Sequence, residues 1–227
     1  MNVVPLSAAA LAERLAEAAV SLSLAAAAAD PPYGVRVGVD GAVQGDSEPL
    51  ADDVAGAVAA AGRPVARVRR ADFLRPRSVR LELGADDPDA GWERWYDDAA
   101  LRREVLDSLA PAAARPASPP VRPPAWLPAL WDEERDRSVR ADRVLAAPGQ
   151  VVVVDGPYLL RRELADGFDV VVHLETSDAA LARRVATAEL DRVTASWRRY
   201  VGETAPAERA SCVVRLEDPR HPALVEN

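Results

Sequence analysis

Stretches with strand-like and helix-like hydrophobic spacing alternate along the first part of the chain. Residues 7–29 repeat apolar positions at helical intervals, and the Asp-Pro-Pro sequence at 30–32 ends the predicted helix. The short alternating run at 35–40 predicts a strand, residues 50–61 a second helix, and residues 65–68 a second strand. Strand, loop, helix and strand in this order are typical of a parallel α/β sheet.

The middle of the chain has a different composition. Residues 71–97 are rich in charge, glycine and proline, which predicts loops, and 99–109 form a short predicted helix. Residues 111–128 contain seven prolines, so we expect an extended, semi-rigid insertion there.

Regular structure resumes with Val151–Val154, a continuous β-branched run typical of a central parallel strand buried on both faces. We expect it to lie beside, or nearly beside, the strand at 35–39. The elements predicted after it are a helix over 158–165, a strand over 170–174, a long helix over 178–199 and a strand over 212–216. Because strands flank the proline-rich insertion, we predict a single domain over 1–227, with residues 1–30 as an N-terminal helix.

Composition excludes several kinds of function. All 28 basic residues are arginine, so lysine Schiff-base chemistry is excluded. A net charge of −8 argues against a broad nucleic-acid-binding face. The only histidines are His173 and His221, which rules out a multi-histidine metal site; His173 is predicted to be a core residue, and Cys212 to be buried and inert.

The same sequence predicts a cytoplasmic protein. The N-terminus does not read as a secretory signal, and the uncharged run at 18–29 is too short to span a bilayer. A single cysteine allows no intrachain disulfide, which agrees with a reducing compartment.

The loop after the first strand has the setting of a phosphate-binding loop, whose full motif is G-x-x-x-x-G-K-[ST]. Gly41 and Gly45 lie in this loop, and Asp46, Ser47 and Glu48 follow. Aligned without a gap from Gly41, Ser47 takes the lysine position and Glu48 the hydroxyl position. With one loop residue removed, Asp46 takes the lysine position and Ser47 stays the hydroxyl. Neither register supplies a cation.

Carboxylates at this place oppose phosphate binding. Two like charges about 4 Å apart interact unfavourably by roughly 4 kcal/mol at an effective dielectric near 20. The ordinary interpretation is that Asp46, Ser47 and Glu48 serve the start of the helix, as caps and as partners of its dipole. A Mg²⁺ or Ca²⁺ site built from Asp40, Asp46 and Glu48 is the alternative.

From about residue 33 to 225 the chain resembles the bacterial uridine-kinase-like nucleoside kinases, within the P-loop kinases. The pieces that carry the resemblance are Val35–Gly41, Asp72–Arg77, Gly91–Asp97, Val151–Gly156 with Leu159-Leu160, Leu181–Arg184 and Arg209–Pro219.

The resemblance implies a P-loop kinase fold and a set of site residues. Asp72 and Asp155 are the candidate catalytic carboxylates, although Ala71 stands where the family's motif has its likely base. The implied substrate cleft comprises Arg75, Arg77, Trp92, Trp95, Tyr96, Asp97, Trp131, Asp132 and Arg183. Its arginines can equally form a solvated face or pair with helix carboxylates, and its tryptophans can simply cover the sheet.

Three functions remain open from the sequence. The favoured one is a degenerate kinase with no cofactor, which keeps a cleft for a nucleoside-like small molecule or a protein partner. The second is an active nucleoside or small-molecule kinase using Mg-ATP, in which Arg36, Arg75 or Arg183 replaces the loop lysine. The third is an enzyme of another class that uses the same crevice without ATP.

Overall fold

Residues 2–114 and 124–226 are described by the computed structural model. Seven strands form one sheet in the order β1-β11-β10-β9-β2-β8-β3. Its strands are β1 (Asn2–Pro5), β2 (Val35–Gly41), β3 (Val65–Arg69), β8 (Val151–Pro157), β9 (Val170–Glu175), β10 (Cys212–Arg215) and β11 (Ala223–Glu226). The five strands from β10 to β3 are parallel, and β11 and β1 join antiparallel at one edge.

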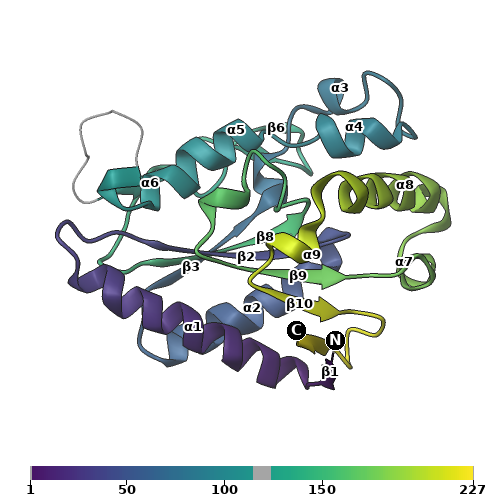
Figure 1. Ribbon diagram of the computed structural model, residues 1–227. Helices are drawn as coiled ribbons and strands as arrows, with labels where there is room; N and C mark the ends of the chain where they lie inside the picture. The colour runs from purple at the N-terminus through teal and green to yellow at the C-terminus, as the bar shows by residue number, and fades with distance from the viewer. Residues whose placement is uncertain (1, 115–123, 227) are drawn as a thin grey trace.

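Helices cover both faces of this sheet (Figure 1). The α-helices are α1 (Ala8–Ala28), α2 (Gln44–Ala60), α3 (Arg77–Arg80), α4 (Pro88–Glu93), α5 (Asp98–Leu101), α6 (Asp107–Leu109), α7 (Asp178–Arg184), α8 (Thr187–Thr204) and α9 (Pro206–Arg209). A π-helical segment, Arg102–Leu106, joins α5 to α6. Short two-residue strands, β4 (Ala125–Trp126) with β7 (Val144–Leu145) and β5 (Trp131–Asp132) with β6 (Arg137–Ser138), form two small ribbons.

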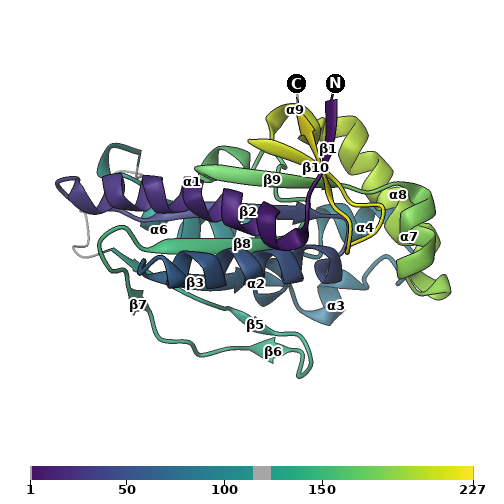
Figure 2. The same cartoon turned by 90° about the horizontal axis from the view of Figure 1, so that it is seen from below.

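The alternation of side chains along β8 separates two cores. Val151 and Val153 pack with α1 and α2, whereas Val152 and Val154 pack with the α5–α6 region. Figure 2 shows α1 and α2 together on one face. All seven residues of β2 and of β8 are buried, and the two strands pair in parallel from Val35↔Val151 onward. The prediction that these two runs are adjacent buried strands is confirmed.

The predicted N-terminal helix is present, but residues 2–5 are a strand. β1 pairs with β11, at the opposite end of the sequence, so no local pattern could reveal it. The second helix also begins earlier than predicted, at Gln44 instead of residue 50, and Pro49 lies inside it. A proline there removes only one N–H from the helical ladder.

Two other helix predictions are wrong. Residues 158–164 form turns, because the N–H groups of Leu159 and Leu160 donate to the Asp40 carboxylate and the Tyr200 hydroxyl instead of to helical carbonyls. The long helix predicted over 178–199 is two helices, α7 and α8, separated at residues 185–186. The break lets α8 return across the face of the sheet (Figure 1).

The proline-rich insertion lies partly outside the described residues, since 115–123 are not among them. After it, Trp126 in β4 is buried and pairs with Val144 in β7. Strands from both sides of the insertion belong to the same sheet. Within the described part of the chain, no helix is both long and apolar enough to cross a membrane.

Replacing either of two glycines by alanine should change the stability of the protein, in opposite directions. A Cβ on Gly38, in β2, would come within 2.9 Å of the Val171 side chain, whereas one on Gly56, in α2, would meet nothing within 4 Å. Gly38→Ala should destabilise the protein by about 1–3 kcal/mol through overpacking. Gly56→Ala should stabilise it by about 0.5–1 kcal/mol through helix propensity. Urea denaturation of both variants measures the difference, and equal effects would contradict the assigned packing of β2.

Candidate functional site

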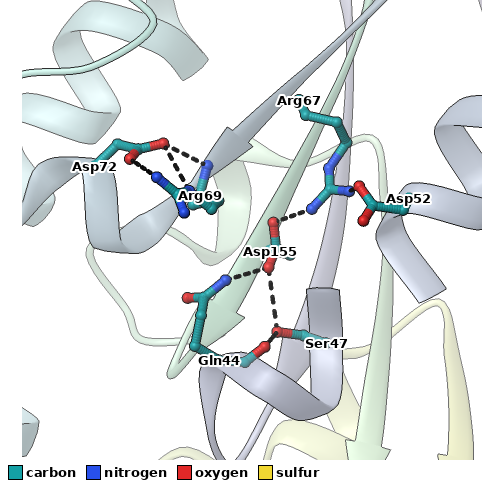
Figure 3. A network of polar contacts seen from close by, with 7 residues as sticks. All are labelled: Gln44, Ser47, Asp52, Arg67, Arg69, Asp72 and Asp155. Carbon is teal, nitrogen blue, oxygen red and sulfur yellow. Dashed lines mark hydrogen bonds and ion pairs between the residues drawn. The ribbon is translucent and has the colours of Figure 1, made fainter. Parts of the chain in front are cut away.

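A fully buried carboxylate, that of Asp155, lies near the carboxyl end of β8. Parallel sheets place ligand crevices at this end of their strands. The carboxylate is surrounded by side chains from β3 and α2 (Figure 3). This end of β2, β8 and β3 is therefore the candidate site.

Both oxygens of Asp155 are engaged within the protein. Arg67, from β3, donates to Oδ1 and also pairs with Asp52 of α2. Gln44 donates its side-chain amide to Oδ2, and the Ser47 hydroxyl lies 3.4 Å from the same oxygen. Burial raises the pKa of the Asp155 carboxyl, and the Arg67 guanidinium opposes that rise. Asp155 is thus an internally compensated charge.

The loop that leads to α2 is short. Only Ala42 and Val43 lie between β2 and α2, and Val43 is an N-cap without a side-chain hydrogen bond. Asp46 lies in the first turn as predicted, but neither it nor Ser47 is the cap. The Ser47 hydroxyl faces Asp155, which agrees with the register in which Ser47 takes the hydroxyl position and Asp46 the lysine position.

Asp46 has its own cation. The Arg184 guanidinium, from the end of α7, donates to Asp46 Oδ1 at 2.7 Å and to the Leu216 carbonyl at 2.6 Å. The Asp46 side chain is 5% exposed, and its Oδ2 is a buried oxygen without a partner among the described residues. Burial raises the pKa of the Asp46 carboxyl, and Arg184 partly offsets the effect.

Asp40, at the end of β2, faces the opposite side of the sheet. Its carboxylate accepts hydrogen bonds from the Leu159 N–H at 2.8 Å and the Tyr200 hydroxyl at 2.7 Å, and it lies 2.7 Å from His173 Nδ1. His173 is a buried, partnered core residue, as predicted. Among residues 2–114 and 124–226 no acidic, histidine or cysteine cluster could hold a metal ion, so the alternative site from Asp40, Asp46 and Glu48 is not formed.

The Asp72 carboxylate is already paired with a neighbouring arginine, Arg69. It caps the short helical turn after β3 and pairs with Arg69 at 2.8 Å, beside the Asp155 network (Figure 3). The hydrogen bond from Arg69 to Asp72 raises the arginine's pKa, and the charges of Glu48 and Asp155 add to the shift. The Asp72 carboxylate is therefore held by a cation.

The aromatic residues predicted in the cleft stack with arginines. Arg70 lies 4.0 Å from the centroid of Tyr96, and Arg192 lies 4.4 Å from that of Trp95. Trp92 packs on Tyr200, with centroids 5.3 Å apart. Such cation–π and aromatic contacts bury the rings against protein. Trp92 is buried, and Trp95 and Tyr96 are half-buried.

The remaining predicted cleft residues have separate places in the structure. Asp97 caps α5, Asp132 pairs with Arg135, Trp131 donates to Asp136, and the exposed Arg183 lies 3.6 Å from Glu217. The backbone carbonyl of Arg75 accepts from Arg80, and the backbone N–H of the exposed Arg77 donates to Asp136.

Three participants were missed from the sequence: Gln44, Arg67 and Arg184. Arg67 interrupts a valine-bearing strand, which is a signal for a buried ion pair. The neighbouring Arg183 was considered as a replacement for the loop lysine. Consecutive helical side chains point about 100° apart, so Arg184 and Arg183 face different surroundings. Arg36, also considered, pairs instead with Asp169 next to the start of β9.

The residues present do not fit Mg-ATP. A phosphate-binding loop surrounds phosphates with backbone N–H groups and adds a cation, and a neighbouring acid supports Mg²⁺. Here the loop has two residues, Asp46 supplies a negative charge, and Asp155 is bonded to Arg67, Gln44 and Ser47.

Comparison with solved structures shows that this fold also occurs in proteins described as kinases. A possible uridine kinase from Bacillus stearothermophilus is similar at 18% identity and TM-score 0.63, over 87% of this chain and 97% of that one. A putative fructose transport system kinase from Silicibacter sp. TM1040 is similar at 22% identity and TM-score 0.53, over 90% and 92%. D-glycerate 3-kinase from Cryptococcus neoformans var. grubii is similar at 15% identity and TM-score 0.51, over 82% and 86%. No family model matches the chain, and no curated protein matches it significantly.

The raised pKa of Asp46 predicts a pH-dependent stability. A carboxyl whose pKa is raised by folding stabilises the protein below its unfolded pKa, and that contribution is lost as pH rises through the folded value. The unfolding free energy of Asp46→Asn, minus that of the parent, should therefore grow as pH rises from about 4 towards 7. Asp155 is present in both proteins, so its contribution cancels. Urea denaturation across this range measures the difference.

The control is Asp53→Asn, which removes one carboxylate from the exposed side of the same helix. A difference between Asp46→Asn and the parent that shrinks as pH rises would contradict a raised pKa at Asp46.

Proposed function

We propose that this protein is a P-loop kinase-like protein that does not transfer phosphate from ATP and that keeps its fold for binding a small molecule or a protein partner. The fold is shared with proteins described as kinases, whereas the charges at the candidate site are already compensated from within. Phosphoryl transfer depends on positioning the phosphates and on neutralising their charge. The positioning of the phosphates and the neutralisation of their charge are both weakened when the protein's own carboxylates lie where the phosphates would bind.

One observation carries this proposal, the ion pair between Asp46 and Arg184. The favoured register places Asp46 where a phosphate-binding loop has its lysine, at the start of α2. Arg184 is a guanidinium at that helix start, and Asp46 engages it at 2.7 Å. An incoming phosphate would have to displace a buried internal anion to reach the same cation. The internal pair therefore competes with any nucleotide.

An active kinase is the second candidate, and Arg184 is also the observation that favours it. An arginine from elsewhere in the chain does reach the place of the missing loop lysine. In this case phosphate would displace Asp46 and bind Arg184 directly. Nucleotide binding by the unaltered protein separates the two candidates.

We expect Mg-ATP at millimolar concentration to leave the melting temperature of the parent unchanged. A ligand at a hundred times its dissociation constant would add about 2.7 kcal/mol, which a thermal-shift experiment detects easily. Asp46→Asn should gain at least about tenfold affinity for ADP and inorganic pyrophosphate, because it removes the competing anion and frees Arg184. Calorimetric titration with and without Mg²⁺ measures the gain.

The matched control is Asp46→Asn combined with Arg184→Gln, which should abolish the gain by removing the cation. A clear Mg-ATP shift in the parent would overturn the proposal in favour of an active kinase. A correctly folded Asp46→Asn variant that gains no affinity would show that the two-residue loop, and not the charge, excludes phosphate.

A further inference from the structure

A cavity on the α8 face of the sheet is lined in part by His173. The imidazole is 2% exposed, and its Nδ1 lies 2.7 Å from Asp40 Oδ2. It stacks on Trp197 with ring centroids 5.5 Å apart and an angle of 19° between the planes. Together these contacts hold the ring in one orientation.

The hydrogen bond at Nδ1 determines what the other ring nitrogen can do. Asp40 accepts from the Leu159 N–H and the Tyr200 hydroxyl as well, so it serves as an acceptor throughout. A neutral His173 must then donate from Nδ1, which leaves a lone pair on Nε2. Within residues 2–114 and 124–226, no hydrogen-bond partner engages Nε2.

His173 forms part of the wall of a cavity of about 870 Å³. Trp197 from α8, Thr176 after β9 and Pro206 from α9 line it as well. The volume is that of a typical small-molecule pocket. Residues of α8 and α9 line the cavity. Asp46 belongs to α2 and Asp155 contacts this helix, which lies on the other face of the sheet from α8 (Figure 1).

The charge of the lining favours a cation. Four carboxylates and two guanidiniums line the cavity. Both guanidiniums already pair with lining carboxylates, Arg198 with Asp178 and Arg215 with Glu175. Of the other two acids, Glu217 lies 3.6 Å from Arg183 and also accepts from Ser177.

The last carboxylate is that of Glu208, on α9. It is exposed, and it has no ion-pair partner within the described part of the chain. Among the described residues, the cavity thus combines a ring nitrogen without a hydrogen-bond partner, an aromatic ring and one carboxylate without an ion-pair partner.

We propose that this cavity binds an organic ammonium ion, with an N–H of the ligand donating to His173 Nε2 and its apolar body lying along Trp197 and Pro206. Asp40 is a positioning residue, because it fixes the tautomer and the orientation of the imidazole. Glu208 supplies the long-range attraction for the positive charge. The site does not depend on nucleotide binding at α2.

The chain allows a direct test because it has only two histidines. His221 is 78% exposed, so His221→Ala leaves His173 as a single reporter with little risk to the fold. With isotope-labelled histidine, nitrogen–proton correlation spectra should show the ring proton of His173 on Nδ1 and none on Nε2, which is the tautomer that the proposal requires. Phenethylamine, as a protonated primary amine, should shift the Nε2 resonance saturably with a millimolar or lower dissociation constant. Phenethyl alcohol and hydrocinnamate, which share its apolar body, should bind at least about tenfold more weakly.

Two pairs of substitutions locate the site. A Cβ on Gly202, which lines the cavity, would meet nothing within 4 Å, so Gly202→Phe should fill the space and weaken binding at least about tenfold. Gly202→Ala is its matched control and should leave binding nearly unchanged. Glu208→Gln should weaken binding about threefold, whereas Glu203→Gln, on α8 but not lining the cavity, should not.

An unshifted His173 resonance in folded His221→Ala would overturn the proposal. So would equal binding of the amine, the alcohol and the carboxylate, since the charge would then play no part. Equal affinities of Gly202→Phe and Gly202→Ala would place the amine outside this cavity and would equally refute it.

Discussion

A fully buried carboxylate must be compensated, and Asp155 imposes this requirement on the end of the sheet. An isolated charge at such a place costs several kcal/mol. Its partners come from different elements: Arg67 from β3, and Gln44 and Ser47 from the first turns of α2. Meeting the requirement therefore fixes where α2 begins and how closely it approaches β8. The two-residue loop before α2 follows from the same contacts.

Two other buried carboxylates near strand ends are also compensated by groups of the protein itself. Asp46 is compensated by Arg184, and Asp40 by donors that include His173 and Tyr200. Arginine suits this arrangement because its planar guanidinium engages several oxygens at once, as Arg184 does with a carboxylate and a backbone carbonyl. In a chain without lysine, every fixed cation is of this kind. An end of the sheet compensated in this way needs no ligand to be stable.

Periodicity predicted the parallel core, because strands such as β2 and β8 are buried on both faces and carry continuous apolar runs. It missed β1, whose pairing partner β11 lies at the other end of the chain, and it misplaced the turn at 158–164, where Asp40 and Tyr200 take the backbone donors. The acids of the site could be predicted from their position after strands. Their partners could not, since Arg67 and Arg184 are brought to them only by the tertiary fold.

The compensation of Asp40 differs in kind from that of the other two acids. Arg67 and Arg184 are permanent cations, and they engage Asp155 and Asp46 directly. Asp40 is instead satisfied by neutral donors and by an imidazole, and an imidazole has a second nitrogen. Because Nδ1 donates to Asp40, the lone pair of His173 Nε2 is left for another partner, and His173 lines the adjacent cavity. The acids on the α2 face are thus compensated by permanent cations, whereas the compensation of Asp40 leaves a ring nitrogen available on the other face.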